Sequence, residues 1–234
     1  MTLSKTAVIT GAGQGIGRAI ALKFAEGGFH IVLVGRTREK LEAVAAQIKG
    51  IEQTASVHAM DVTDHSQAGH LAESLQDKPV DLLVNCAGEA LIKSIEETTE
   101  ADWNRLLSIN LTGPFLMVKA LLPSIRQSEN ASIINIGSVA ATGGFAQITA
   151  YTAAKTGLLG FTRSLGAELR KDEIRVVMLC PGPADTPMRW AATPDFDPKM
   201  VLDTETIADT IWWLASLPRG TTTSEFLLRS IHLD

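Results

Sequence analysis

Three side chains in the middle of the chain could together carry out acid–base chemistry. Tyr151 and Lys155 are four residues apart, so in a helix both would project from one face. A phenol with a pKa of about 10 exchanges protons poorly near neutrality, and a nearby ammonium group favours its phenolate form. Ser138 follows an apolar run typical of a buried strand, at the strand end where open α/β sheets bind ligands. The pattern predicts general acid–base catalysis at a carbonyl or carbinol group.

The surroundings of the Tyr–Lys pair favour a helix. Small residues separate the two side chains, and apolar residues recur at helical spacing in the segment that follows, TGLLGFTRSLGAEL. A tyrosine four residues before a lysine is nevertheless also common on a solvated helix face. The catalytic interpretation therefore needs a second, independent motif.

A glycine-rich segment near the start of the chain is that second motif. The apolar run 5–10 leads directly into residues 11–17, GAGQGIG, and a segment with helical periodicity follows. In this context, glycines let backbone N–H groups and the helix N-terminus approach a pyrophosphate. The alternative is a plain glycine-rich turn. The flanking elements favour a dinucleotide-binding site.

The end of the second expected strand indicates which dinucleotide binds. Residues 30–35, HIVLVG, are expected to form this strand, and 37–49 the next helix. An acidic residue at this strand end would bind both ribose hydroxyls and repel a 2′-phosphate. This chain has Gly35 followed by Arg36, so a guanidinium group takes the place of a carboxylate. The pattern favours NADP(H) over NAD(H), and the alternative is an exposed arginine at a helix start.

The rest of the chain continues the alternation of strands and helices. Strands are expected at 55–60, 80–84, 132–137, 173–180 and 224–231, and helices at 64–76, 100–127, 151–170 and 204–217. The helix 100–127 should be kinked beside Asn110, because Gly113 and Pro114 are poor mid-helix residues. We therefore expect residues 1–234 to form one domain, a three-layer, doubly wound, Rossmann-like α/β parallel sheet with helices on both faces. The proline-rich segment 184–203 is expected to be a substrate lid.

Composition and charge exclude several classes of protein. The 234 residues are 45% hydrophobic and 20% charged, and the net charge of −5 without a basic cluster argues against nucleic acid as a partner. No uninterrupted apolar run reaches the ~18 residues of a membrane span. The N-terminus lacks the pattern of a signal peptide, so a cytoplasmic location is expected. Cys86 and Cys180 are expected to be buried and reduced, and the histidines show no metal-ligand spacing.

Taken in order, these motifs make the chain resemble the short-chain dehydrogenase/reductase family, in its short single-domain branch. The resemblance covers nearly the whole chain and implies an NAD(P)-dependent oxidoreductase. The motifs that carry it are Thr10-Gly11-x-x-x-Gly15-Ile16-Gly17, Asp61-Val62, Asn85-Cys86-Ala87-Gly88, Asn110, Ser138, Tyr151-x-x-x-Lys155 and Pro181-Gly182.

The resemblance also implies a role for each candidate site residue. Tyr151 would be the acid/base, and Lys155 would bind the nicotinamide ribose and lower the pKa of the tyrosine. Ser138 would orient the substrate oxygen, and Asn110 would hold a water that relays protons to Lys155. The expected cofactor-binding residues are Gly11, Gln14, Gly15, Ile16, Gly17, Arg36, Asp61, Val62, Asn85, Ala87, Gly88, Tyr151, Lys155, Pro181, Gly182 and Thr186.

The chain departs from the family pattern in two places. Cys86 stands where the family usually has a second asparagine, which is expected to weaken a bond between loops without loss of function. The C-terminus, SEFLLRSIHLD, lacks the glycine-rich tail that many members carry at their tetramer interface. A homotetramer or homodimer is still expected, because the helices 100–127 and 151–170 carry apolar residues on more than one face. These residues include Leu111, Phe115, Leu158 and Phe161.

The substrate pocket is expected to be apolar. Its candidate residues follow strand ends or lie in the lid, and they are Leu91, Phe145, Ile148, Met188 and Trp190. They favour a ketone or ketoacyl-type substrate with little charge, whose carbonyl or secondary alcohol exchanges a hydride with the nicotinamide. The alternative is that some of them pack in the core or in an interface.

Two other functions on the same fold are weighed against an oxidoreductase. A non-catalytic nucleotide-binding scaffold need not keep Ser138, Tyr151 and Lys155 together. A lyase-like member of the family, such as a dehalogenase, would have a disrupted glycine loop and an arginine in the lysine position. This chain has an intact loop and Lys155, so an oxidoreductase is favoured.

Overall fold

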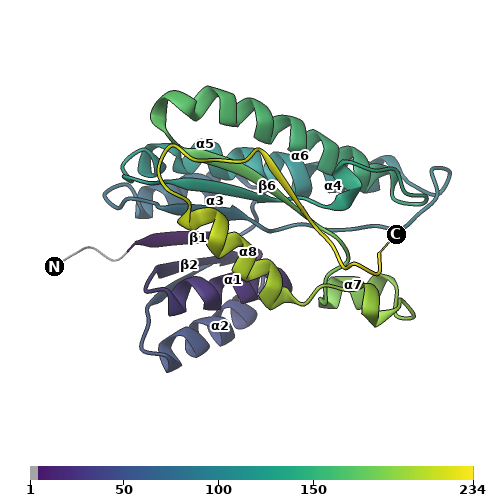
Figure 1. Cartoon of the computed structure of the whole chain (residues 1–234), viewed down its shortest axis with the longest axis horizontal. Helices are drawn as coiled ribbons and strands as arrows, with labels where there is room; N and C mark the ends of the chain where they lie inside the picture. Colours follow the sequence, from purple (N-terminus) through teal and green to yellow (C-terminus); the bar gives the residue numbers. More distant parts are fainter. Residues whose placement is uncertain (1–4, 234) are drawn as a thin grey trace.

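The computed structural model describes residues 5–233, and its centre is a seven-stranded parallel sheet between two layers of helices (Figure 1). The strand order is β3-β2-β1-β4-β5-β6-β7. This arrangement confirms the doubly wound fold expected from the sequence. The strands are β1 (Thr6–Thr10), β2 (His30–Gly35), β3 (Ala55–Ala59), β4 (Leu82–Asn85), β5 (Ser132–Ile136), β6 (Arg175–Pro181) and β7 (Glu225–Leu228).

The strands form from short apolar runs because both faces of the sheet are covered. A parallel sheet buried on both faces selects continuous β-branched and aliphatic residues rather than an alternating pattern. Along β1 and β2, Ile9 and Leu33 point to one face, and Val8 and Val32 point to the other. All four are fully buried. The sequence signal of each strand therefore reflects two hydrophobic cores, one on either side of the sheet.

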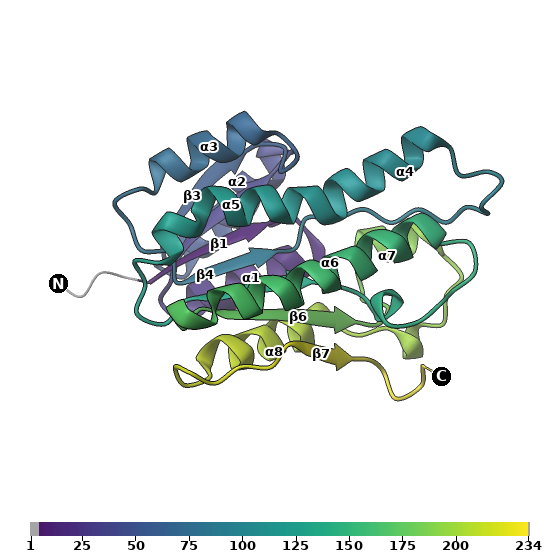
Figure 2. The same cartoon turned by 90° about the horizontal axis from the view of Figure 1, so that it is seen from above.

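Each face has its own layer of helices. One layer contains α1 (Gly15–Glu26), α2 (Arg38–Gly50) and α8 (Thr204–Ser216), and Phe24 of α1 packs on Trp212 of α8 with ring centroids 5.1 Å apart. The other layer contains α3 (His65–Ser74), α4 (Glu100–Leu107), α5 (Gly113–Ile125) and α6 (Thr149–Glu168). Figure 2 shows α4 and the short helix α7 (Pro187–Ala192) near the same end of the sheet, where the strands finish.

The chain direction reverses next to β1, and this reversal brings two loops together. The chain runs outward to β3 and then returns to β4 on the other side of β1. Ligands of open α/β sheets bind at such a switch point. The Thr10 hydroxyl accepts hydrogen bonds from the backbone N–H groups of Cys86 and Ala87, both at 3.0 Å. This link uses the main chain of Cys86, so it does not depend on the side chain that replaces the family's asparagine.

The long helix expected over 100–127 is interrupted at the predicted place. A π-helical turn, Ser108–Thr112, separates α4 from α5. The segment Glu100–Ile125 is long and apolar enough, by length and composition, to cross a membrane, although the sequence shows no uninterrupted apolar run of that length. Met117 and Leu121 of this segment are fully buried in the core beside the sheet. A helix buried in a protein core can be as long and as apolar as a membrane-spanning helix.

The lid differs from its expected irregular conformation. It contains α7 and a 3₁₀ turn at Pro198–Met200, and the short α7 leaves no periodicity in the sequence. The lid is pinned at its base, because Asp185 N donates to Leu202 O and Leu202 N donates to Pro183 O, both at 2.8 Å. Strand and helix boundaries elsewhere differ from the expected ones by a few residues at most.

Candidate active site

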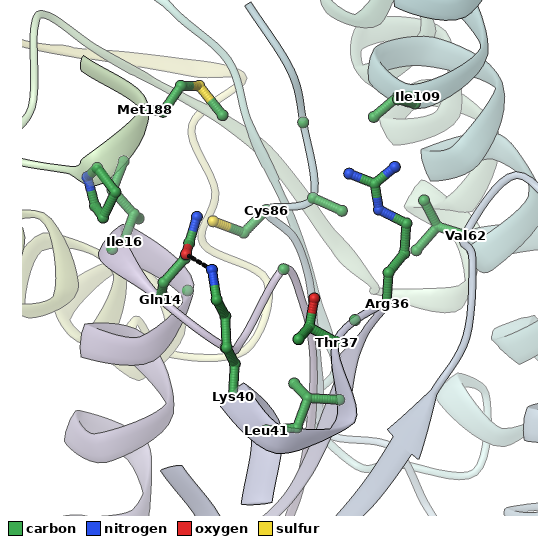
Figure 3. A pocket seen from close by; sticks show the side chains of 18 of the residues that line it. Gln14, Ile16, Arg36, Thr37, Lys40, Leu41, Val62, Cys86, Ile109 and Met188 are labelled. Atoms are coloured by element: carbon green, nitrogen blue, oxygen red, sulfur yellow. Dashed lines mark hydrogen bonds between the residues drawn. The ribbon is translucent and has the colours of Figure 1, made fainter. Parts of the chain in front are cut away.

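A cleft of about 290 Å³ opens at the carboxyl ends of β1, β2 and β4 (Figure 3). We call it the glycine-loop cleft. Eleven of the expected cofactor-binding residues line it: Gly11, Gln14, Gly15, Ile16, Gly17, Arg36, Asp61, Val62, Ala87, Gly88 and Thr186. The remaining lining residues include Gly35, Thr37, Lys40, Leu41, Met60, Ile109 and Met188.

Close backbone contacts explain why the loop after β1 is rich in glycine. A Cβ atom on Gly17 would lie 2.3 Å from the carbonyl oxygen of Gly11. Gly11 itself has a φ of +68°, and a Cβ there would lie 2.9 Å from Ala87 N. The loop can therefore pass between β4 and the N-terminus of α1 only with glycine at positions 11 and 17. This geometry suits a pyrophosphate at the helix N-terminus, so these residues fit a dinucleotide.

Gly17→Ala should destabilise the protein because the added methyl group meets a backbone carbonyl. We expect a loss of about 1–3 kcal/mol, the usual cost of overpacking a tight site. Gly69→Ala, in α3, is the matched control, because nothing lies within 4 Å of its Cβ position. It should be neutral or stabilising by about 0.5–1 kcal/mol, as for glycine in a helix interior. Urea unfolding of both variants measures the difference, and an equally stable Gly17→Ala protein would contradict the packing argument.

Two cations project toward the glycine-loop cleft beside the expected position of the adenosine ribose (Figure 3). Arg36 follows Gly35 at the end of β2, as the sequence predicts. Lys40, in the first turns of α2, was not predicted, and its Nζ donates to Gln14 Oε1 at 2.5 Å. The available signal was its spacing, since Lys40 lies four residues after Arg36. Both cations line the glycine-loop cleft beside the end of β2.

Five expected cofactor-binding residues lie outside the lining of the cleft. Asn85 is buried, and its Nδ2 donates to Asn135 Oδ1 at 2.8 Å. Pro181 ends β6 and is also buried, and Gly182 N donates to Leu228 O at 2.7 Å. In this structure these residues join neighbouring strands, and their expected role in binding the cofactor stays a prediction. Tyr151 and Lys155 also lie outside the cleft lining, next to the loop that follows β4.

The four predicted catalytic residues come from three neighbouring elements. Ser138 follows β5, Asn110 lies in the π-helical turn, and Tyr151 and Lys155 lie in α6. The Lys155 Nζ is 5.8 Å from the centroid of the Tyr151 ring and donates to Ile136 O at 2.8 Å. A Cβ on Gly88 would lie 2.9 Å from Asn110 Oδ1 and 3.7 Å from Lys155 Nζ. Asn110 and Lys155 therefore contact the loop that forms one wall of the glycine-loop cleft.

Asn110 is fully buried, and both donors of its amide group are used in hydrogen bonds. Its Nδ2 donates to Glu89 O at 2.9 Å and to Leu106 O at 3.0 Å, while its Oδ1 accepts from Glu89 N at 3.3 Å. The side chain thus joins the π-helical turn to the loop after β4. The expected role of Asn110 in holding a relay water stays a prediction.

Burial and two neighbours control the proton affinity of Tyr151. Burial raises the pKa of its phenol, while a hydrogen bond from Ser138 and the positive charge of Arg189 lower it. Burial also lowers the pKa of Lys155 to about 8. The expected effect of Lys155 on Tyr151 stays a prediction. Arg189 was not recognised as a neighbour of Tyr151 in the sequence, because nothing in the lid pattern places it there.

The five expected substrate-pocket residues are not gathered in one cavity of the described residues. Met188 lines the glycine-loop cleft, whereas Trp190 Nε1 donates to Asp185 Oδ1 at 2.7 Å. Half of the Phe145 side chain is exposed. Leu91 and Ile148 lie in two loops that are joined by a backbone bond from Lys93 N to Gln147 O, at 2.7 Å. These loops and the lid flank the same end of the sheet (Figure 2).

Comparisons with known proteins agree with this geometry. The family model described as short chain dehydrogenase matches residues 5–196. An uncharacterized oxidoreductase of Staphylococcus epidermidis is 31% identical over 229 residues, which cover 97% of each chain.

Two solved structures show the same fold with nicotinamide cofactors bound. An alcohol dehydrogenase of the archaeon Thermococcus sibiricus, complexed with 5-hydroxy-NADP, is 27% identical, with a TM-score of 0.91 over 99% of each chain. A short chain dehydrogenase of Mycobacterium paratuberculosis, bound to NAD, is 28% identical, with a TM-score of 0.88 over 97% of this chain and 96% of the other. The chain described here belongs to the short-chain dehydrogenase/reductase family, as an NAD(P)-dependent oxidoreductase.

Proposed function

We propose that this protein is an NADP(H)-dependent carbonyl reductase or alcohol dehydrogenase acting on a largely apolar ketone or 3-ketoacyl-type substrate. One observation carries the proposal. Ser138 and Lys155 both lie near Tyr151, and Lys155 also lies beside Gly88, which lines the glycine-loop cleft. This arrangement supports the proposal that the tyrosine and the lysine act as an acid–base pair next to the wall of a dinucleotide site.

The bound nicotinamide would supply or accept the hydride, and the protein's own residues would handle the proton. In the reducing direction, the Tyr151 hydroxyl gives its proton to the carbonyl oxygen, which the Ser138 hydroxyl orients. A positive charge on Lys155 and Arg189 stabilises the phenolate that remains. In the oxidising direction, the phenolate accepts the proton from the alcohol.

The preference for NADP(H) rests on the residues around the ribose site. Gly35 leaves no carboxylate to repel a 2′-phosphate, and Arg36 and Lys40 offer two cations. Family members bind either NAD or NADP, so this preference is a property of these three positions rather than of the fold.

A ketone panel tests the proposed function. Oxidation of NADPH is followed with apolar ketones, polyhydroxy ketones and 3-ketoacyl thioesters. We expect turnover with the apolar ketones or the thioesters and slower turnover with polyhydroxy substrates. Turnover restricted to polyhydroxy compounds would contradict the proposed substrate class, and no carbonyl reduction with either cofactor would contradict the proposed reaction.

Ser138→Ala should slow the reaction and change the titration of Tyr151. Loss of one hydrogen bond to the reacting oxygen should lower kcat/KM by about tenfold. Because Ser138 lowers the pKa of Tyr151, its removal should shift the formation of tyrosinate to higher pH. Tyr151 is the chain's only tyrosine, so the ultraviolet difference absorption of tyrosinate reports on it directly. An unchanged midpoint in Ser138→Ala would contradict the predicted contact.

We also propose that the protein is a homodimer or homotetramer that uses the outer face of α5 and α6. Phe115 is 43% exposed, and its ring centroid lies 6.3 Å from that of Phe161. Leu158 does not belong to this face, because it is buried in the core. Sedimentation equilibrium should give a multiple of the monomer mass for the wild type and a smaller mass for Phe115→Lys. A monomeric wild type at micromolar concentration would rule the proposal out.

A further inference from the structure

One cation beside the predicted catalytic tyrosine has no acidic partner. Arg189 lies in α7, directly after Met188, which lines the glycine-loop cleft. Its side chain is partly buried, yet it takes part in none of the ion pairs between described residues. Partial burial of an unpaired charge is unfavourable, so a fold that keeps it needs either compensation or a ligand.

The guanidinium group of Arg189 is held in place but is not saturated. Its Cζ lies 4.7 Å from the centroid of the Phe196 ring, in a cation–π contact. Its Nη1 donates to Thr193 Oγ1 at 3.0 Å. A guanidinium has five N–H donors, and among the described residues this is its only hydrogen bond. Donors therefore remain for an acceptor from outside the chain.

The surroundings of Arg189 leave its charge available to the active site. Asp185 accepts the indole N–H of Trp190, and Asp197 accepts the backbone N–H of Lys199 at 2.9 Å. None of the four lid carboxylates, which are Asp185, Asp195, Asp197 and Asp203, forms an ion pair with Arg189. Its positive charge reaches the phenol of Tyr151, and each group changes the pKa of the other in the direction expected for attraction between guanidinium and phenolate. The cation therefore lies near Tyr151, in a helix whose Met188, the preceding residue, lines the glycine-loop cleft.

We infer that Arg189 binds a carboxylate of the substrate while the reacting carbonyl or alcohol lies at Tyr151. The inference rests on the proposed carbonyl reductase function and narrows its substrates to oxo acids, or hydroxy acids in the oxidising direction, with an otherwise apolar body. A planar guanidinium matches a carboxylate with two parallel hydrogen bonds. The single unpaired cation suits this monoanion better than a phosphate dianion. The sequence alone favoured a substrate with little charge, because it did not show that Arg189 lies near Tyr151.

Matched acids and esters test the inference. Oxohexanoates that differ in the position of the keto group are compared with their methyl esters in the wild type, Arg189→Met, Arg189→Lys and Arg170→Met. Arg170→Met is the control, because it removes the same charge from an exposed residue of the 3₁₀ turn Leu169–Asp172. In the wild type we expect at least one acid to have a kcat/KM about tenfold or more above that of its ester.

Arg189→Met should lower the acid-to-ester ratio of kcat/KM by about tenfold to a hundredfold, Arg189→Lys should restore part of it, and Arg170→Met should leave it unchanged. The tyrosinate midpoint should also rise in Arg189→Met, since the removed cation favours the phenolate. An equal loss on acid and ester, or a ratio near one in the wild type, would overturn the inference while leaving the carbonyl reductase function intact. The inference would also be overturned if the lower kcat/KM of Arg189→Met came from weaker NADPH binding, which fluorescence titration measures.

A binding measurement makes the inference independent of turnover. Calorimetric titration of the wild-type enzyme in the presence of NADP should show the preferred oxohexanoate binding more tightly than its methyl ester, and Arg189→Met should abolish this difference. If no carbonyl is reduced, the proposed reaction fails, and this titration alone decides whether Arg189 binds a carboxylate. Acid and ester binding with equal affinity to the wild type would refute it.

Discussion

Tyr151→Phe should reduce kcat for ketone reduction by about a hundredfold to ten-thousandfold, the usual contribution of a general acid–base group. The substitution removes only the hydroxyl that carries the proton. The aromatic ring that packs beside Lys155 stays, so the dissociation constant for NADPH should change by less than about tenfold, the effect of one neutral hydrogen bond. Single-turnover oxidation of NADPH in both proteins separates the chemical step from product release.

The single tyrosine provides the control for this experiment. Difference absorption between wild type and Tyr151→Phe across the alkaline range gives the titration of Tyr151 itself. Because burial raises its pKa, the free enzyme should form tyrosinate above the ordinary pH of about 10. The rate of alcohol oxidation, which needs the phenolate, should therefore increase with pH in the alkaline range. Equal single-turnover rates in the two proteins would eliminate Tyr151 as the acid/base.

Substitutions at Arg36 and Gly35 should shift the cofactor preference from NADPH toward NADH. The wild type should favour NADPH over NADH, and Arg36→Ala should lower kcat/KM for NADPH by about tenfold to a hundredfold, the effect of a charge-assisted hydrogen bond. The NADH kinetics should be nearly untouched. Gly35→Asp should add a carboxylate that repels the 2′-phosphate and binds the ribose hydroxyls. The added Cβ would lie 3.3 Å from Leu41 Cδ2, so the end of one flexible side chain must move by a few tenths of an ångström.

Arg38→Ala is the matched control for the charge change. Arg38 belongs to the same turn of chain, but it pairs with Glu42 at 3.6 Å and does not line the glycine-loop cleft. It should leave both cofactors unaffected. Lys40→Met should lower kcat/KM for NADPH by less than Arg36→Ala does, because the Lys40 ammonium group also donates a hydrogen bond to Gln14. A wild type that prefers NADH, or an Arg36→Ala protein with unchanged NADPH kinetics, would show that Arg36 is only a surface arginine.

The order of elements and the parallel sheet could be predicted because their causes are local in sequence. A strand covered on both faces must be apolar along its whole length, and each helix must place apolar residues at a spacing near its turn. The glycines between β1 and α1 could be interpreted for the same reason, since strand, loop and helix are contiguous. The kink beside Asn110 followed from Gly113 and Pro114, whose backbone limits do not depend on distant contacts.

Only the tertiary structure decided which side chains meet across elements that are distant in the chain. Asn85 is one case, because the neighbouring strand presents Asn135 to it and the Asn85 Nδ2 donates inside the sheet. Its expected role in binding the cofactor stays a prediction. Arg189 approaches Tyr151 because the lid returns to the ends of the strands, a path set by the pairing of Ala184 with Leu202. The periodicity of apolar residues indicates which face of a helix or strand is buried. It does not indicate which charged side chain from a distant loop lies near that helix or strand. The sequence therefore determined the fold and the family and predicts the acid–base residues, whereas the charges around Tyr151 depended on how the lid packs.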